Sequence, residues 1–465
     1  MNFTRDLIEC APSQSRALVE LARDGSRREW TFGELAEAAR GLAGALHARG
    51  VRRGDVVLTL IGNRPEWAIT MLACFRQGYV VLPCTEQLRA KDLEHRLAVA
   101  RPRIIVADPR NAELLGDREF VWREAGPAPP PVELAPEDPC LITFTSGTSG
   151  EPKAVLHGQR YLTGQQLQAG HWLAPKPGDL VWCTAASGWS KSARNAFIAP
   201  WLRGAAAVLH DARFDPHERL ELIARERVDV LCMAPTEYRV IAKRATLQPL
   251  PLKGLVAAGE ALNPEVLHAW HEATGLSIRD GYGQTETGQL TGMPPGETPR
   301  PGSMGRPLPG ITLTVADGEL VLDPATDPTF FLRYLGEEPH TGPWRTGDRV
   351  TSDEDGFLFF EGRTDDVIIS AGYRIGPFEV ESALVAHEAV AEAAVVAAPD
   401  DERGSVVRAV VVLRDGYVPS DELARALQDH VKNLTAPYKY PRIVDFRSEL
   451  PKTPSGKVRR AALRD

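Results

Sequence analysis

Strand-like and helix-like segments alternate in the first half of the chain, and this order constrains the fold more than any other sequence feature. Residues 55–63 and 79–84 are apolar runs typical of buried strands. Between them, residues 65–78 predict a helix, because Pro65 suits a first turn and Gly78 suits a helix end. Further strand-like runs follow at 101–108, 229–235 and 252–260. Strands that alternate with helices predict an α/β fold with mostly parallel sheets.

The second half of the chain has a different texture. After a proline-rich stretch at 125–139, which predicts an extended surface connection, short β segments and turns dominate around 300–360. A chain of 465 residues also exceeds one compact core. We therefore expect a large N-terminal domain, residues 1–364, in which helices flank β-sheets and which includes a small β-barrel region. A small α+β C-terminal domain is expected at residues 365–465.

Composition excludes several classes of function. The formal net charge is −8, whereas a nucleic-acid-binding protein needs a basic face, so we expect no nucleic-acid partner. The chain does not start with a basic segment and an apolar run, and it has no stretch of about 18 apolar residues. We expect no signal peptide, no membrane span and a cytoplasmic location. The six cysteines form no CxxC pair and predict neither a disulfide framework nor a zinc site.

The strongest local signal for chemistry is the segment LITFTSGTSGEPKAVLHG at 141–158, where a strand-like run leads into a Thr, Ser and Gly loop and then Lys153. Glycines let backbone N–H groups approach phosphate oxygens closely, and a lysine can add a point charge. The Walker A spacing GxxxxGK[ST] is absent. Taken alone, such a loop is more often a flexible surface turn than a phosphate site.

The run 145–153 resembles the phosphate loop of the adenylate-forming (AMP-binding) superfamily, which holds acyl-CoA synthetases, peptide-synthetase adenylation domains and luciferases. Four further segments match the superfamily in order, at 257–262, 280–288, 344–350 with 360–381, and 451–460. The chain is most similar to the medium-chain acyl-CoA synthetases, through residues 187–193, 234–239, 301–307 and 435–442. The resemblance implies an AMP-forming carboxylic acid–CoA ligase that uses ATP, Mg²⁺ and coenzyme A with a medium-chain or aromatic carboxylic acid.

The resemblance assigns ATP binding to three groups of residues. Those of the loop are Thr145, Ser146, Gly147, Thr148, Ser149, Gly150 and Lys153. Those around the adenine are Gly259, Glu260, Ala261, Asp280, Gly281, Tyr282, Gly283, Gln284 and Thr285, with Tyr282 stacked on the base. Asp348 and Arg363 would bind the ribose, although read alone they also fit a surface ion pair worth little. Glu286 would hold Mg²⁺, because a carboxylate suits a hard cation.

Lys457, in PSGKVRR, is expected to be the lysine that drives adenylation, with Thr145 and Glu286 completing the catalytic set. When a carboxylate attacks the α-phosphate, charge builds on the bridging oxygens and on the leaving pyrophosphate. A cation placed there stabilises the transition state more than the ground state. Asp365 matches the hinge of the superfamily, so the C-terminal domain is expected to rotate about it. Read alone, the segment around Lys457 is a solvated basic tail.

The resemblance places the second half-reaction in the C-terminal domain. The positions that would serve coenzyme A are Gly372 and Tyr373 along the thiol channel, and Arg403, Lys432 and Tyr440 against the nucleotide. Arg374 would contact phosphates during adenylation. Ala371 stands where the subgroup often carries serine, which leaves a carrier-protein thiol open as the alternative acceptor. A non-catalytic nucleotide-binding regulator and a homodimeric state also stay open.

Trp189, Ser190, Lys191 and residues 281–283 would line the acyl pocket. Acetate-specific relatives carry a tryptophan where this chain has Gly283, so a longer or aromatic acid is expected to fit. Arg194 departs from the subgroup, which usually has an aromatic residue there. A buried arginine needs an anionic or polar partner, so Arg194 could read a polar substituent of the substrate, but a place on the domain surface is the favoured expectation.

Overall fold

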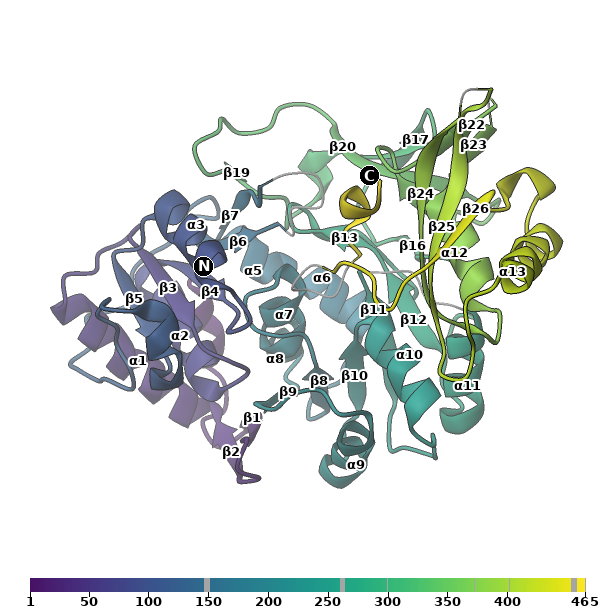
Figure 1. The fold of residues 1–465 in the computed structure, drawn as a ribbon. Helices are drawn as coiled ribbons and strands as arrows, with labels where there is room; N and C mark the ends of the chain where they lie inside the picture. The colour runs from purple at the N-terminus through teal and green to yellow at the C-terminus, as the bar shows by residue number, and fades with distance from the viewer. Residues whose placement is uncertain are drawn as a thin grey trace. The chain divides into compact units, whose positions relative to one another are not determined.

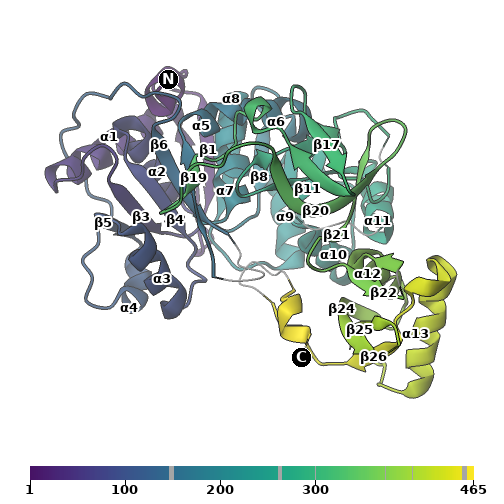
Figure 2. The same ribbon diagram turned by 90° about the horizontal axis from the view of Figure 1, so that it is seen from above.

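The computed structural model describes residues 1–145, 151–259, 264–298, 300–371, 373–400, 402–452 and 458–464, in two compact units (Figures 1 and 2). The first unit comprises residues 1–145, 152–312 and 323–342. The second is built mainly from the described residues of 313–322 and 343–465. This division does not test the expected domain boundary at 364/365, which stays a prediction.

A seven-stranded sheet forms one half of the first unit, in the order β12-β11-β10-β8-β9-β1-β2. Neighbours from β12 to β1 run parallel, and β2 pairs antiparallel at the edge. The strands are β1 (Arg16–Leu21), β2 (Arg27–Thr31), β8 (Leu180–Cys183), β9 (Ala206–His210), β10 (Val230–Met233), β11 (Gly254–Ala258) and β12 (Ile278–Gly281). These parallel pairings confirm the α/β fold that the alternation predicts.

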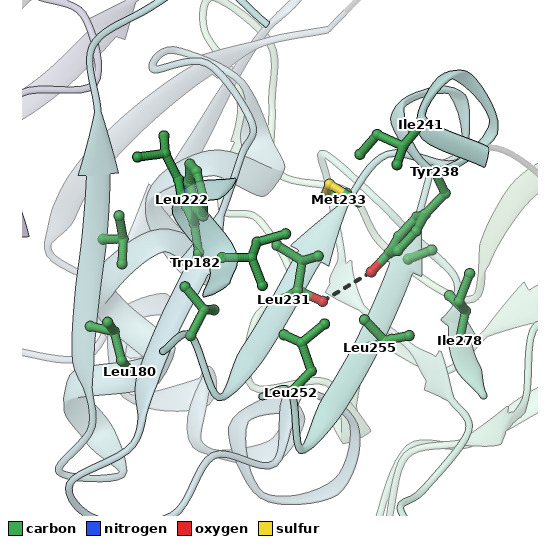
Figure 3. Packing of buried hydrophobic residues seen from close by; sticks show 14 of the residues in the cluster. Leu180, Trp182, Leu222, Leu231, Met233, Tyr238, Ile241, Leu252, Leu255 and Ile278 are labelled. Atoms are coloured by element: carbon green, nitrogen blue, oxygen red, sulfur yellow. Dashed lines mark hydrogen bonds between the residues drawn. The ribbon is translucent and has the colours of Figure 1, made fainter. Parts of the chain in front are cut away.

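One face of this sheet is covered by α9 (Pro216–Glu226), α10 (Pro235–Arg244) and α11 (Pro264–Thr274). Trp182 and Leu231 point from the sheet into this core, and Tyr238 reaches it from α10 (Figure 3). The Tyr238 hydroxyl donates a hydrogen bond of 3.1 Å to Leu231 O, so its polar atom is satisfied inside the apolar layer.

A second sheet of the same unit has the order β19-β7-β6-β4-β3-β5. Its strands are β3 (Val56–Leu60), β4 (Val80–Cys84), β5 (Ile104–Ala107), β6 (Pro139–Phe144), β7 (Ala154–Gly158) and β19 (Arg333–Tyr334). Helices α1 (Phe32–Ala48) and α2 (Pro65–Gln77) lie on one face, and α3 (Ala90–Ala100) and α4 (Ala112–Leu115) on the other (Figure 2). The predicted helix start and end at Pro65 and Gly78 are confirmed, since Gly78 caps α2 with φ +66°.

Short helical segments lie between the two sheets (Figures 1 and 2). They are α5 (Arg160–Gly164), α6 (Gln166–Gln168), η3 (Ala169–Leu173), α7 (Ser190–Ala193), η4 (Arg194–Ile198) and α8 (Ala199–Leu202). Small antiparallel pairs follow β12, formed by β13 (Gly283–Gln284) with β14 (Gly288–Gln289), and by β15 (Thr291–Gly292) with β16 (Arg306–Pro307). The remaining short turns are η1 (Thr4–Ile8), η2 (Pro109–Asn111) and η5 (Pro324–Thr326).

An antiparallel sheet opens the second unit, in the order β17-β18-β20-β21. Its strands are β17 (Leu313–Ala316), β18 (Glu319–Leu322), β20 (Trp344–Ser352) and β21 (Leu358–Arg363). Among the described residues β21 does not pair with β17, so the expected small β-barrel region is an open sheet. Closure into a barrel would require hydrogen bonds between the first strand and the last, and these two strands lie at opposite edges of the described sheet.

The rest of the second unit is the expected small α+β fold. A three-stranded sheet of β24 (Val390–Asp400), β25 (Gly404–Leu413) and β26 (Ile443–Phe446) packs against α12 (Pro377–Val385) and α13 (Asp421–Leu434). The pair β22 (Ile368–Ser370) and β23 (Tyr373–Ile375), with turns η6 (Pro437–Lys439) and η7 (Arg460–Leu463), completes it. Of the helices that the structure describes in either unit, none combines the length and apolar character that a bilayer crossing requires.

Candidate active site

Several predicted site residues of the first unit follow directly on the carboxyl ends of its strands. Thr145 comes after β6, Gly259 after β11 and Tyr282 after β12, while the loop after β8 leads to Trp189. Ligands of open α/β sheets bind beyond this edge, because loops of adjacent strands converge there. The fold therefore gathers the loop, adenine and acyl positions of the first unit at strand ends.

The base of the phosphate loop is closed by two hydrogen bonds between Thr145 and Lys153. Thr145 N donates to Lys153 O at 2.9 Å, and Lys153 N donates to Thr145 Oγ1 at 3.0 Å. The bonds continue the antiparallel pairing of β6 with β7, in which Phe144 lies opposite Ala154. The loop thus leaves a rigid pair of strands, although its predicted residues Ser146, Gly147, Thr148, Ser149 and Gly150 lie outside the described residues.

Lys153 and Glu286 are brought together through Tyr334, which sequence reasoning missed. Lys153 Nζ lies 3.1 Å from Glu337 Oε1 and 4.4 Å from the ring centroid of Tyr334. The hydroxyl of Tyr334 donates a 2.8 Å hydrogen bond to Glu286 Oε1. Tyr334 reaches this place because β19 pairs with β7, with Tyr334 opposite Val155. No motif marks that long-range pairing in the sequence.

Glu286 suits a magnesium ion held jointly with substrate phosphates. Mg²⁺ is usually bound by one or two carboxylates and the phosphate oxygens, rather than by an all-protein cage. Glu286 supplies one half-buried carboxylate next to the cationic Lys153 region, and Phe331 N fixes its backbone by donating to Glu286 O at 2.8 Å. Over the described ranges, no group of three or more His, Cys, Asp or Glu residues is arranged for a metal. A single carboxylate beside Lys153 fits a magnesium ion that would be held mainly by phosphate oxygens.

The adenine positions that the structure describes lie at the end of β11 and β12. Gly259 has φ +103°, which glycine adopts readily, and a methyl group there would lie 3.2 Å from Lys191 Nζ. Asp280 is buried, and burial raises the pKa of its carboxyl group well above the ordinary value, although Gly281 N donates to it at 2.8 Å. Tyr282 is half-buried and its backbone bonds to Thr291. Glu260 and Ala261 lie outside the described residues.

Gln284 ends β13, and Thr285 and Glu286 follow it in the turn that leads to β14. Gln284 N donates to Thr287 Oγ1 at 3.1 Å, which holds this turn in shape. The end of β13 and this turn therefore carry three successive predicted residues in one hairpin.

Asp348 and Arg363 pair across two strands of the second unit. They lie opposite each other on β20 and β21, and Arg363 Nη1 donates to Asp348 Oδ1 at 3.2 Å and to Thr346 O at 3.1 Å. Asp348 is only 5% exposed, which sets this pair apart from a surface ion pair. A buried carboxylate held by a guanidinium keeps a fixed orientation, as an acceptor for two ribose hydroxyls requires. The ribose role itself stays a prediction.

Asp365, the expected hinge residue, lies two residues after the end of β21. Arg363 Nε contacts Asp365 Oδ1 at 3.4 Å, and Arg464 Nη2 donates to Asp365 O at 3.1 Å. The exposed Asp365 is thus linked to the C-terminal turn as well as to β21. Lys457 lies outside the described residues.

The predicted coenzyme A positions lie close together in the second unit. Ala371 N donates to Arg403 O at 3.0 Å, and Tyr373 stacks on Tyr438 with ring centroids 4.3 Å apart. Lys432 Nζ lies 4.4 Å above the Tyr440 ring. Tyr438 is half-exposed and was missed from the sequence. Gly372 and the side chain of Arg374 are outside the description, although Arg374 pairs through its backbone with Ile369.

The acyl-pocket residues sit on a loop tied to the second sheet. Ser187 N donates to Asn63 Oδ1 at 2.9 Å, and Gly188, at φ +90°, approaches the backbone of Thr85 so closely that a methyl group would lie 2.4 Å from Thr85 N. Trp189 then caps α7, which carries Ser190 and Lys191. Lys191 Nζ donates to Ala258 O at 3.4 Å. Lys191 thereby joins the acyl residues to the adenine strand.

Gly283 has a structural reason to be glycine besides the expected pocket. A methyl group at this position would lie 1.8 Å from Gly288 O, within the β13–β14 pair. Any side chain at Gly283, a tryptophan included, would therefore displace the β14 strand. The expected opening of the acyl pocket at Gly283 stays a prediction.

Arg194 corrects a sequence expectation. It was expected on the domain surface, but it is buried, with 4% of its surface exposed. The reason is the position of α7, η4 and α8 between the two sheets, where every residue from Ser192 to Trp201 is buried. The segment begins with the polar residues Ser190, Lys191 and Ser192, so its sequence does not predict this burial.

Comparisons with known proteins agree with this geometry. Residues 8–328 match the AMP-binding enzyme family, and residues 379–457 match the AMP-binding enzyme C-terminal domain. The chain belongs to the AMP-binding enzyme family. Over 98% of its length it is 38% identical to the uncharacterized acyl--CoA ligase YtcI of Bacillus subtilis (strain 168), covering 93% of that protein.

Two further relatives share the full length of the chain. The acyl-coenzyme A synthetase ACSM3, mitochondrial, of Mus musculus is 36% identical over 100% of this chain and 90% of that protein. The structure of a benzoate CoA ligase from Burkholderia xenovorans LB400 matches with a TM-score of 0.89 at 26% identity, covering 100% of both chains.

Proposed function

We propose that this chain is an AMP-forming carboxylic acid–CoA ligase. The observation that carries the proposal is the arrangement of Lys153 over the Tyr334 ring, with Tyr334 hydrogen-bonded to Glu286, beside the closed base of the phosphate loop. The chain that carries it is a member of the AMP-binding enzyme family. Its relatives include an acyl-coenzyme A synthetase and a benzoate CoA ligase. A medium-chain or aromatic carboxylic acid is the substrate class that the sequence expectation names.

In the first step, the substrate carboxylate attacks the α-phosphate of ATP, which forms acyl-AMP and releases pyrophosphate. The loop N–H groups and Lys153 hold the phosphates, and Tyr334 orients the Glu286 carboxylate by hydrogen bonding. Magnesium bound at Glu286 would neutralise phosphate charge. Asp348, oriented by Arg363, accepts hydrogen bonds from the ribose hydroxyls. Lys457 stabilises the charge that develops during attack.

In the second step, the thiolate of coenzyme A attacks the acyl carbon and AMP leaves. Residues 365–465 act as the mobile C-terminal domain and rotate about Asp365 relative to the AMP-binding domain, residues 1–364. Rotation withdraws Lys457 and brings the loop of Ala371 and Tyr373 to the acyl-adenylate. The cluster of Lys432, Tyr440 and Arg442 offers cations and a ring to a phosphorylated nucleotide, which favours coenzyme A over a carrier-protein thiol.

The test measures AMP and acyl-CoA with MgATP across acetate, octanoate, benzoates and cinnamates. We expect both products in equal amounts with octanoate or an aromatic acid, and acyl-CoA only when coenzyme A is present. Acid-dependent pyrophosphate without any CoA thioester would move the acceptor to a carrier-protein thiol or another nucleophile. No acid-dependent AMP across the whole panel would overturn the ligase and favour a nucleotide-binding regulator.

A further inference from the structure

A buried arginine with unused hydrogen-bond donors lies among the elements that carry the expected acyl pocket. Arg194 is 4% exposed, and within the described ranges its Nε and Nη1 atoms have no hydrogen-bond partner. Burying a charged group without an opposite charge is costly, so native proteins nearly always pair such a group or use it for a ligand. Arg194 is therefore a residue whose partner remains to be found.

Other donors and acceptors on the same short helix are equally unsatisfied. Ser190 lies four residues before Arg194, which places both on one face of the helical segment. The Ser190 hydroxyl and both polar atoms of the Asn195 side chain are buried and, over the described residues, lack hydrogen-bond partners. Ser190 is also one of the expected acyl-pocket residues. Several unused polar atoms on one helix point to a polar ligand rather than to a single misplaced side chain.

Three ionisable side chains interact electrostatically with Arg194, and none of them is hydrogen-bonded to its Nε or Nη1 atom among the described residues. Burial, together with the charges of Arg194 and Arg160, lowers the pKa of His157 to about 3, so this imidazole is neutral at pH 7. The Tyr161 hydroxyl lies near both Arg194 and Ser190, whose side chains lower its pKa, but burial raises that pKa more, so the hydroxyl stays protonated and carries no charge to balance the guanidinium. Asp327 is the acidic neighbour: burial raises its pKa to about 6, so it is mostly ionised at pH 7 and offsets part of the charge of Arg194 through space, without a hydrogen bond to it.

Asp327 is engaged elsewhere rather than with Arg194. Its Oδ1 atom accepts from Thr329 N at 2.8 Å and from Thr329 Oγ1 at 2.7 Å. Its Oδ2 atom has no hydrogen-bond partner within the described ranges, just as Arg194 Nη1 has none. Because Asp327 Oδ2 and Arg194 Nη1 both lack a hydrogen-bond partner there, these two atoms are not hydrogen-bonded to each other.

The guanidinium end of Arg194 lies against the hairpin that follows the adenine strand. A methyl group in place of a hydrogen on Gly288 would lie 3.5 Å from Arg194 Nη1. Gly288 pairs with Gln284 in the β13–β14 hairpin, which begins at the expected acyl position Gly283. The helix that begins at Ser190 and the β13–β14 hairpin both carry residues of the expected acyl pocket. Arg194, at the end of that helix, lies against the hairpin.

We propose that Arg194 binds an anionic oxygen acceptor, in the first place a second carboxylate, on the acid that this enzyme activates. This inference rests on the proposed ligase function and deepens it, because it names the substrate class. The acid carries one carboxylate that is adenylated and a distal one that pairs with the guanidinium. Ser190 and Asn195 offer further hydrogen bonds to the distal group.

The experiment compares acids of matched shape that differ only at the distal end. The pairs are octanedioate with octanoate, and terephthalate with 4-methylbenzoate; 4-acetylbenzoate supplies a neutral acceptor. Acid-dependent AMP release is measured for the wild type, for Arg194→Met, which removes the charge at similar volume, and for Arg194→Lys. Arg219→Met is the matched control. Arg219 is likewise buried, but it stacks on Trp182 in the core between the seven-stranded sheet and helices α9 to α11.

We expect the wild type to prefer the distal carboxylate in kcat/KM by at least ~10²-fold, because a site built to bond a substrate group rejects an analogue that lacks it. Arg194→Met should reverse or abolish this preference, Arg194→Lys should keep part of it, and Arg219→Met should leave it unchanged. Thermal melting with MgATP gives a second readout. Octanedioate or terephthalate should raise the Tm of the wild type but not that of Arg194→Met.

The possible failures are distinguishable. If the wild type and Arg194→Met had the same kcat/KM for the monocarboxylic acids, and neither preferred the acid with a distal carboxylate, the Arg194 inference would be overturned. The ligase function would be left intact. A preference for 4-acetylbenzoate over terephthalate would overturn the distal carboxylate and reassign Arg194 to a neutral acceptor. Absence of AMP release with every acid would instead contradict the ligase itself.

Discussion

The phosphate side and the acyl side of the first unit differ in how their polar groups are satisfied. On the phosphate side, Thr145 and Lys153 bond to each other, and Tyr334 bonds to Glu286. On the acyl side, Arg194, Ser190 and His157 keep buried polar atoms without partners among the described residues. Preorganised groups reduce the reorganisation needed at the moment of reaction. The residues expected to bind ATP are thus already bonded to one another within the protein, whereas we propose that the substrate acid supplies the missing hydrogen bonds on the acyl side.

The largest effect is expected from Lys457→Ala, which removes the charge proposed to act in adenylation only. Adenylation should fall by ~10²-fold or more, because one transition-state contact of this kind is worth that much. Thioester formation from supplied acyl-AMP should largely survive. The two half-reactions are measured separately, with Lys452→Ala, an exposed lysine paired with Glu392, as the control. Equal loss in both half-reactions would contradict alternation of the C-terminal domain.

Asp348→Asn probes the nucleotide side next. The substitution keeps the shape but removes the negative charge that Arg363 orients and that ribose hydroxyls would use. Loss of a hydrogen bond to a charged group is worth about 1.5–3 kcal/mol, so KM for ATP should rise by roughly tenfold or more. KM for the acid should stay the same. Steady-state kinetics, with each substrate varied in turn, measures both KM values. A change in the KM for the acid without a change in the KM for ATP would disprove the ribose assignment.

Tyr334→Phe tests the contact that the sequence did not reveal. It deletes one hydroxyl and leaves the ring on which Lys153 rests. The lost bond to Glu286 should lower kcat by about tenfold at limiting Mg²⁺, since such a bond is worth about 1.5 kcal/mol. Saturating Mg²⁺ should recover much of the loss. Tyr417→Phe, at an exposed position, is the control, and an Mg²⁺-independent defect in Tyr334→Phe would separate Tyr334 from the metal site.

His157→Gln tests whether the buried His157 beside Arg194 is neutral in the folded protein, through the pH dependence of the free energy of unfolding. Because the folded-state pKa of His157 is lowered from 6.5 to about 3, protonation favours the unfolded chain. This contribution to stability is complete above pH 6.5 and is lost as the pH falls toward 3, by at most about 1.4 kcal/mol per pH unit. The free energy of unfolding of the wild type should fall more steeply from pH 7 to pH 5 than that of His157→Gln. Denaturant melts measure it, with the exposed His268→Gln as control; parallel slopes would refute neutral burial.

The sequence predicts features that depend on neighbours along the chain. Pro65 and Gly78 bound α2 because caps act locally, and the strand before Thr145 follows from its apolar run. Features set by distant partners escaped prediction. Tyr334 reaches Glu286 only because β19 pairs with β7. Arg194 is buried only because two sheets enclose its helix, which no local pattern of polar and apolar residues records.

The same limit applies to the small β-barrel region. Its strands were visible as short β segments, yet whether four strands close or remain open depends on pairing between the first and the last. Such pairing is a property of distant residues. Residues 146–150 and Lys457 stay predictions from the resemblance, since they lie outside the described residues.

The decisive measurement is exchange of labelled pyrophosphate into ATP, without coenzyme A. A ligase that forms an acyl-adenylate should catalyse exchange that depends on a carboxylic acid, requires Mg²⁺ and is lost in Lys457→Ala. Exchange that does not need an acid, or cleavage of ATP to ADP and phosphate in its place, would contradict an acyl-adenylate intermediate.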